Sequence, residues 1–145
     1  MPQDKPHIFF SPEEVNVLIP QLETHFQNFW SCRQNAQRIL EGLREKARNA
    51  MPATPLRISQ NQIRQSQAHF LLEQGRKELE MILEIGGVIK DLEIGIVDFP
   101  HMLEFEEEKV YLCWRFGEKK VRFWHSVHEG FSDRKSLSRR VHHSR

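Results

Sequence analysis

The stretch of sequence that decides the fold runs from residue 88 to residue 134. It begins VIKDLEIGIVDFP (residues 88–100), continues VYLCWRFGEKKVRFWH (residues 110–125) and ends EGFSDR (residues 129–134). Apolar residues alternate with polar ones along much of it, which is typical of strands with one buried face. We therefore predict strands at about residues 91–98, 110–116 and 121–125, with residues 117–120 as a hairpin connection between the last two.

Two long helices are predicted before these strands. Ser11-Pro12-Glu13-Glu14 is a helix start, because Ser11 can cap, Pro12 suits the first helical position and Glu14 can complete a capping box. Apolar residues then recur every seven positions and predict a helix at about residues 12–49. A second helix is predicted at about residues 59–85, ended by Gly86. A short proline-bearing link between the two favours an antiparallel hairpin.

Together these elements predict an α+β fold, in which a long antiparallel helical hairpin packs on a three-stranded antiparallel β-meander. A chain of 145 residues fits one domain with one core. We expect residues 1–131 to form that single domain. Residues 132–145 are polar and basic, and we expect them to be a flexible tail.

Composition and charge limit the class of protein. A net charge of +1 gives no overall reason to expect binding to nucleic acid or to anionic lipid. The two cysteines, Cys32 on a predicted helix and Cys113 on a predicted strand, favour reduced thiols over a disulfide framework. The chain has neither an apolar signal segment at its start nor the roughly 20 apolar residues of a membrane span. We therefore expect a cytoplasmic protein that does not enter a membrane.

The expected register of the last hairpin predicts what its two faces carry. If Phe116 pairs with Val121, His125 faces the helices and Arg115 is directly opposite Arg122 on the outer face. Two opposed arginines require acidic neighbours, which the first strand can supply. The expected ligand or interface residues are the acids, arginines and aromatic residues of this face and of the segment after it: Asp91, Glu93, Tyr111, Arg115, Arg122, Trp124, Phe131 and Arg134.

Four motifs resemble an uncharacterised bacterial family, domain of unknown function 2203. They are FSPEEVNVLIPQL (residues 10–22), IKDLEIGIVDFP (89–100), VYLCWRFGE (110–118) and FWHSVHEGFSDR (123–134). The resemblance spans roughly residues 9 to 137 and implies a bacterial protein. Members of the family are sometimes labelled as division-initiation or rRNA-related proteins. The resemblance implies no activity, substrate or catalytic residue.

Two kinds of chemical site are alternatives to an interface. His125, His128 and Glu129 are candidate metal ligands, but their spacing matches no established ligand motif. The candidate catalytic residues for acid–base chemistry are Asp91, Glu93, His125 and Glu129. No nucleophile or phosphate-loop signature accompanies them. No cofactor is predicted, and a divalent metal remains the alternative.

The sequence favours a self-associating interaction module without catalytic activity. An outer sheet face that is both aromatic and charged, next to open sheet edges, is typical of an interface between copies of a chain. The helical stripe can pair with another copy instead. One alternative is a small metal- or ligand-binding enzyme that uses the acid, arginine and histidine cluster of the sheet. A second alternative is contact with RNA, and only through the basic tail.

Overall fold

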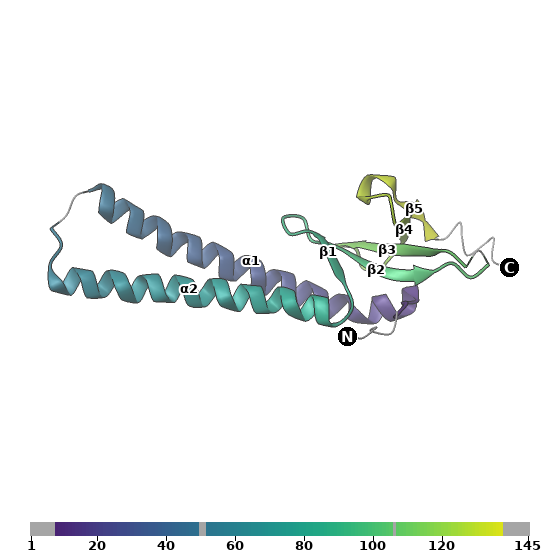
Figure 1. Cartoon of the computed structure of the whole chain (residues 1–145), viewed down its shortest axis with the longest axis horizontal. Coiled ribbons are helices and arrows are strands. Elements are labelled where there is room, and N and C mark those ends of the chain that lie inside the picture. The colour runs from purple at the N-terminus through teal and green to yellow at the C-terminus, as the bar shows by residue number, and fades with distance from the viewer. Residues whose placement is uncertain (1–7, 50–51, 106, 138–145) are drawn as a thin grey trace, which may run out of the picture. The chain divides into compact units, whose positions relative to one another are not determined.

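The computed structural model describes residues 8–49, 52–105 and 107–137, and the chain divides into two compact units. Met1–Glu23 and Ile82–Arg145 form one unit, which we call the sheet unit. Thr24–Met81 forms the other, which we call the hairpin unit. Figure 1 labels the elements of both.

The two predicted helices are present as α1 (Pro12–Arg48) and α2 (Pro55–Glu84). The capping box forms as expected, because Ser11 Oγ accepts from Glu14 N at 3.1 Å and Glu14 Oε1 accepts from Ser11 N at 2.8 Å. The second helix begins earlier than predicted, since Thr54 Oγ1 accepts from the N–H of Arg57 at 3.2 Å and caps it. In the described part of the chain, no helix has enough consecutive apolar sequence to cross a membrane.

Within the hairpin unit, α1 and α2 run antiparallel (Figure 1), and His25 of α1 contacts Glu78 of α2 through a 2.8 Å hydrogen bond. Small residues of α2 also lie at the contact with α1. Ala68 and Gly75, one heptad apart on α2, are buried. A methyl group added at Gly75 would lie 3.3 Å from Phe29 Cδ1 and 3.5 Å from Cys32 Cβ. Glycine is therefore what allows α1 and α2 to approach this closely.

The sheet has five antiparallel strands rather than the predicted three. The order is β1-β2-β3-β4-β5. The strands are β1 (Val88–Asp91), β2 (Ile96–Met102), β3 (Lys109–Arg115), β4 (Phe123–Ser126) and β5 (Lys135–Ser136), with a 3-10 helix, η1 (Phe131–Asp133), before the last. Figure 1 labels β5 next to β4, and the yellow turn that precedes β5 is η1.

The first predicted strand, residues 91–98, is wrong because a turn interrupts it. Asp91 Oδ1 accepts from the backbone N–H groups of Glu93 and Ile94, both at 2.8 Å. Gly95 then takes a φ of +89°, which glycine adopts without steric cost. The chain reverses here, so that β1 ends at Asp91 and β2 begins at Ile96.

The fifth strand lies in the segment expected to be a flexible tail. β5 pairs with β4, with Phe123 opposite Ser136 and Trp124 opposite Lys135. The Leu137 N–H also donates to the Arg122 carbonyl at 2.8 Å. The tail prediction therefore fails for residues 132–137, and residues 138–145 lie outside the described part of the chain.

One face of the sheet packs in the core of the sheet unit. Val97, Leu112 and Trp114 are fully buried on this face. Phe99 is buried with them, and its ring centroid lies 5.1 Å from that of Phe10. The buried apolar helix residues of this unit are Val15, Ile19, Leu22 and Ile82. The other face of the sheet carries the polar residues of the candidate site.

Candidate functional site

The register of β3 and β4 decides which side chains share the outer face of the sheet. Tyr111 pairs with His125 and Leu112 pairs with Trp124, one residue away from the predicted register. His125 is therefore on the outer face, and Trp124 is on the face of Leu112. Because side chains alternate along a strand, a slip of one residue exchanges the two faces.

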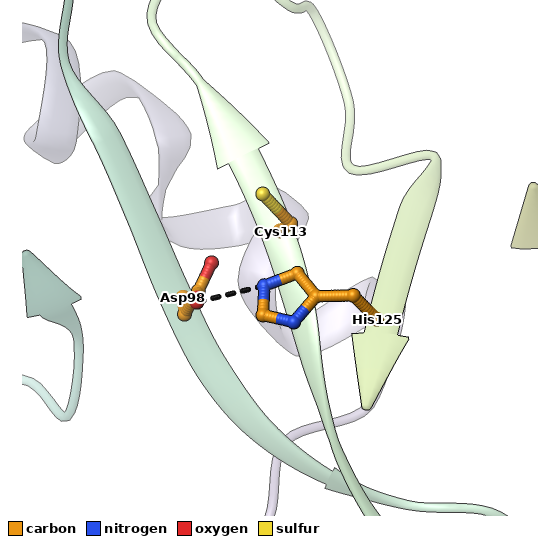
Figure 2. A group of neighbouring side chains, drawn as sticks. All are labelled: Asp98, Cys113 and His125. Carbon is orange, nitrogen blue, oxygen red and sulfur yellow. Dashed lines mark hydrogen bonds and ion pairs between the residues drawn. The ribbon is translucent and has the colours of Figure 1, made fainter. Parts of the chain in front are cut away.

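Asp98, Cys113 and His125 form a buried cluster on this outer face (Figure 2). They come from β2, β3 and β4 in turn, and Asp98 is directly opposite Cys113 in the ladder. Their exposed fractions are 0%, 0% and 1%. His125 Nε2 lies 2.9 Å from Asp98 Oδ2, and one potential ligand atom from each residue lies within 4.8 Å of the other two.

The hydrogen bonds of His125 determine where its protons are. Nδ1 lies 2.8 Å from the Ser126 carbonyl oxygen, which can only accept, so Nδ1 carries a hydrogen. Nε2 therefore faces Asp98 in one of two ways. Either Nε2–H donates to an ionised carboxylate, or a protonated Asp98 donates to Nε2. In both cases the contact between the two side chains holds one proton.

Burial dominates the ionisation of the other two members. It raises the pKa of the Asp98 carboxyl, although His125, Cys113 and Lys90 each act to lower that pKa. Burial, reinforced by the charge of Asp98, raises the pKa of the Cys113 thiol from 9.0 to about 12. The thiol is consequently protonated at neutral pH. Because the thiolate is the nucleophilic form, this cluster is not an activated cysteine nucleophile.

Lys90 is one of two cations beside the cluster, and it lies next to Asp98. Its Nζ is 4.0 Å from Asp98 Oδ2 and 5.2 Å from the centroid of the Tyr111 ring. The Tyr111 ring is in turn 5.8 Å from that of His125, on the same face. The Lys90 side chain is 45% exposed, so it can move away from the carboxylate without disturbing the buried core.

Arg134 holds the segment around η1 against the outer face. Its Nη1 donates to Glu118 Oε2 at 3.0 Å. Its guanidinium carbon lies 4.1 Å from the centroid of the Phe123 ring and 4.0 Å from that of Phe131. Arg134 also acts to lower the pKa of Cys113, so it is near the buried cluster. The predicted interface residues Phe131 and Arg134 thus cover part of this face within one chain.

The predicted acids do not join the cluster. Asp91 serves the turn after β1, and Glu93 is exposed in that turn. Glu129 is also exposed. Its Oε1 accepts from Lys135 Nζ at 2.6 Å and from the Ser126 N–H at 3.0 Å, which together lower its pKa to about 2. Asp98 is the acid that the structure places on the outer face.

The remaining predicted residues are also spread over the sheet unit. Arg115 is exposed, with its guanidinium carbon 6.0 Å from the Phe131 ring centroid. Arg122 precedes β4, so it does not pair with Arg115 in the ladder. The Lys135 Nζ lies over the Trp124 ring, 4.9 Å from the centroid of that ring. His128 is exposed in the turn after β4, and of the predicted catalytic and metal candidates only His125 lies in the cluster.

Two members of the cluster, Asp98 and Cys113, were not among the predicted site residues. Asp98 is an acid in the otherwise apolar run IVDF, and such a residue in a buried strand needs a partner. Cys113 was predicted only to be a reduced thiol on a strand. Its place opposite Asp98 depends on the β2–β3 register, which cannot be obtained from the motif alone.

The hairpin unit has a second surface of interest, an exposed apolar stripe along α2. Its members are Leu56, Ile63, Phe70 and Met81, with exposed fractions of 69%, 58%, 62% and 47%. At 3.6 residues per turn these four fall within a sector of about 40°, roughly 120° away from the contact with α1. The stripe therefore lies to one side of the contact with α1 and is not covered by that helix.

A groove runs beside the middle of this stripe. It has a volume of about 700 Å³. It is lined by apolar or uncharged polar residues of α2 together with one residue of α1: Ile39, Ser59, Gln62, Ile63, Ser66, Gln67, Phe70 and Leu71. None of these lining residues carries a charge.

Comparison with known proteins gives the family. A family model described as "Uncharacterized conserved protein (DUF2203)" matches residues 8–137. The chain belongs to this family. The match to DUF2203 confirms the resemblance in the strand motifs and covers both the outer-face cluster and the apolar stripe. No curated protein and no solved structure matches the chain.

Proposed function

We propose that this DUF2203 protein is an interaction module that associates with a second copy of itself through the apolar stripe of α2. The observation that carries the proposal is that the hairpin unit has fewer fully buried apolar side chains than large exposed ones. Among its described residues, the fully buried apolar side chains are Phe26, Ala36 and Ala68. The large exposed ones are more numerous: Leu56, Ile58, Ile63, Phe70, Leu72 and Met81. A unit with so little core gains stability by burying more apolar surface.

The chemistry of the stripe favours an identical partner. Because the groove is uncharged, two copies can meet there without repulsion between like charges. Glutamine side chains such as Gln62 and Gln67 both donate and accept hydrogen bonds, so a glutamine can pair with the same residue of another chain. Leu56, Ile63 and Phe70 are spaced by seven residues, as in helices that pack side by side. A two-fold arrangement would place the same stripe on both sides of the interface.

This proposal moves the interface from the sheet to the helices. Self-association was predicted through the outer sheet face, but Phe131 and Arg134 already pack against that face within the chain. The stripe has no comparable cover among the described residues, as its exposed fractions indicate. The absence of catalytic activity is part of the same proposal, and a protonated Cys113 supports it.

Substitution within the stripe tests the proposal. Phe70→Lys places a charge at the centre of the proposed interface, and we expect it to convert the dimer into a monomer in sedimentation velocity measurements. Leu72→Lys is the matched control, because Leu72 is exposed on the same helix but outside the stripe. We expect this control to remain dimeric. Equal sedimentation of the wild type and both variants would contradict the proposal.

Two further expectations, bacterial origin and cytoplasmic location, accompany the proposal, and RNA contact is a separate alternative. We propose a bacterial, cytoplasmic protein, and the free thiols of Cys32 and Cys113 are consistent with a reducing compartment. Contact with RNA was predicted only through the basic tail, whose residues 138–145 lie outside the described part of the chain. RNA binding through the tail stays a prediction. Truncation of the chain after Leu137 tests this prediction, because any salt-sensitive RNA binding should then be lost.

A further inference from the structure

Three potential metal ligands converge in the sheet unit, and each comes from a different strand. Asp98, Cys113 and His125 supply a carboxylate oxygen, a sulfur and an imidazole nitrogen within 4.8 Å of one another (Figure 2). The antiparallel ladder fixes the three backbone positions, so the side chains are held together without a loop. A rigid scaffold of this kind favours a preorganised site.

His125 has the hydrogen bond that a metal-binding histidine usually has. Its Nδ1–H donates to the Ser126 carbonyl oxygen at 2.8 Å. Such a bond to the backbone fixes the tautomer and leaves the other ring nitrogen available as a ligand. That other nitrogen, Nε2, is the atom that points at Asp98.

Asp98 supplies a second and independent observation. Its Oδ1 is fully buried and accepts no hydrogen bond from an N–H or O–H group of the described residues, and the Cys113 thiol, a weak donor, is near enough to act on the pKa of this carboxyl. A buried carboxylate oxygen without a strong donor is costly, and a bound cation is one of the groups that satisfy it. The orphaned oxygen lies in the same cluster as the thiol and Nε2.

We propose that Asp98, Cys113 and His125 form a binding site for one divalent transition metal ion of the zinc class. A set of one thiolate, one imidazole and one carboxylate suits Zn²⁺, whereas Mg²⁺ and Ca²⁺ prefer oxygen ligands alone. Three protein ligands leave a fourth position for a water molecule or another small ligand. The site goes beyond the proposed self-association and lies in the other unit of the chain.

The proton balance of binding follows from the hydrogen bonds. In the metal-free protein one proton is shared between Asp98 and His125 Nε2, and the Cys113 thiol carries another. Coordination through Nε2 and Sγ replaces both protons, because a thiol that coordinates a metal ion is deprotonated. The Nδ1–H stays on the Ser126 carbonyl. Each ion bound therefore releases two protons to the solvent.

Lys90 is a competitor for the proposed ion. Its ammonium lies 4.0 Å from Asp98 Oδ2, where a dication would repel it. Because the Lys90 side chain is 45% exposed, it can withdraw into solvent when the ion enters. Removal of its charge should therefore strengthen binding without loss of the buried core.

Cobalt titration of the reduced, tag-free chain tests the proposal. Co²⁺ bound to a thiolate absorbs in the near ultraviolet through sulfur-to-metal charge transfer, whereas Co²⁺ bound only by nitrogen and oxygen does not. We expect one Co²⁺ per chain with this absorption, and its loss when Zn²⁺ displaces the cobalt. Binding without charge-transfer absorption, or no binding at all, would overturn the proposal.

The two cysteines provide a control that does not depend on the folding of a cluster variant. In Cys32→Ser the single remaining thiol is Cys113. We expect this variant to keep the full charge-transfer band, and its disappearance would show that Cys113 is not the ligand. Cys113→Ser and His125→Ala should lose stoichiometric binding, whereas His128→Ala, an exposed histidine beyond β4, should keep it.

A matched pair of lysine variants tests the geometry further. Lys90→Met should bind Zn²⁺ severalfold more tightly than the wild type, as measured by competition with a chromophoric chelator. Lys109 also lies over the Tyr111 ring, at 5.7 Å, but no described contact joins it to Asp98. Lys109→Met should therefore leave the affinity unchanged. An unchanged or weaker affinity for Lys90→Met would count against the site.

Discussion

The ionisation of the Cys113 thiol should make the free energy of unfolding depend on pH. Burial raises its pKa from 9.0 to about 12, so the folded chain keeps a proton that the unfolded chain loses above about pH 9. The stability contributed by the protonated thiol is therefore complete below pH 9 and is lost as the pH rises toward 12. The slope is about 1.4 kcal/mol per pH unit within that window.

Alkaline denaturation in the presence of a chelator measures this effect. We expect the free energy of unfolding of the wild type to fall between pH 9 and 11. Cys113→Ala should be less stable overall but should show a flatter dependence on pH. Cys32→Ala serves as the control and should keep most of the wild-type slope. The same slope in Cys113→Ala and the wild type would mean that Cys113 ionises at its ordinary pKa.

Arg134 is the second residue whose contribution can be measured alone. Its guanidinium bonds to Glu118 and stacks between Phe123 and Phe131, with only 14% of the side chain exposed. We expect Arg134→Ala to lower the free energy of unfolding by about 1–3 kcal/mol. Arg115→Ala removes an exposed arginine near the same Phe131 ring, and its effect should stay within about 0.5 kcal/mol. Urea denaturation compares the two.

The α-helical elements were predicted well from local signals. The capping box at Ser11 and the heptad spacing after Val15 gave α1 to within a residue or two, because both signals depend on neighbours along the chain. The contact between the helices was less visible. It uses Ala68 and Gly75, which hydrophobic patterns do not emphasise, whereas the larger apolar residues Ile63 and Phe70 of the same helix are exposed.

The strands show where sequence patterns mislead. Apolar alternation continues through residues 91–95, but Asp91 and Gly95 form a turn there, so the first predicted strand had the wrong place. The register of the last hairpin was wrong by one residue, since the connection extends to Arg122 and β4 begins at Phe123. Because of this shift, the prediction placed His125 on the core face, whereas it lies on the outer face. The contact between His125 and Asp98 was therefore not predicted.

Close packing of the two helices is testable at the level of the element. Gly75→Leu inserts a side chain where a methyl group already lies 3.3 Å from Phe29, so we expect a loss of about 1–3 kcal/mol in the free energy of unfolding. Gly42→Leu is the matched control on α1, because nothing lies within 4 Å of an added methyl group there. It should be neutral or stabilising, as leucine favours the helix over glycine. Thermal unfolding followed by circular dichroism distinguishes the two, and a neutral Gly75→Leu would contradict close packing.

At the scale of the whole molecule, the two units carry different chemistry. The sheet unit buries a carboxylate, a thiol and an imidazole together, whereas the hairpin unit exposes an uncharged apolar stripe. The two proposals can therefore fail separately. A chain that loses its metal ligands can still associate, and a monomeric stripe variant can still bind the ion.

The molar mass of the wild-type chain in solution tests the central claim most directly. Light scattering coupled to size exclusion, over a range from low to tens of micromolar, should give a mass that approaches twice 17.3 kDa as the concentration rises. A mass that stays at 17.3 kDa throughout this range would show that the stripe of α2 does not join two copies of the chain.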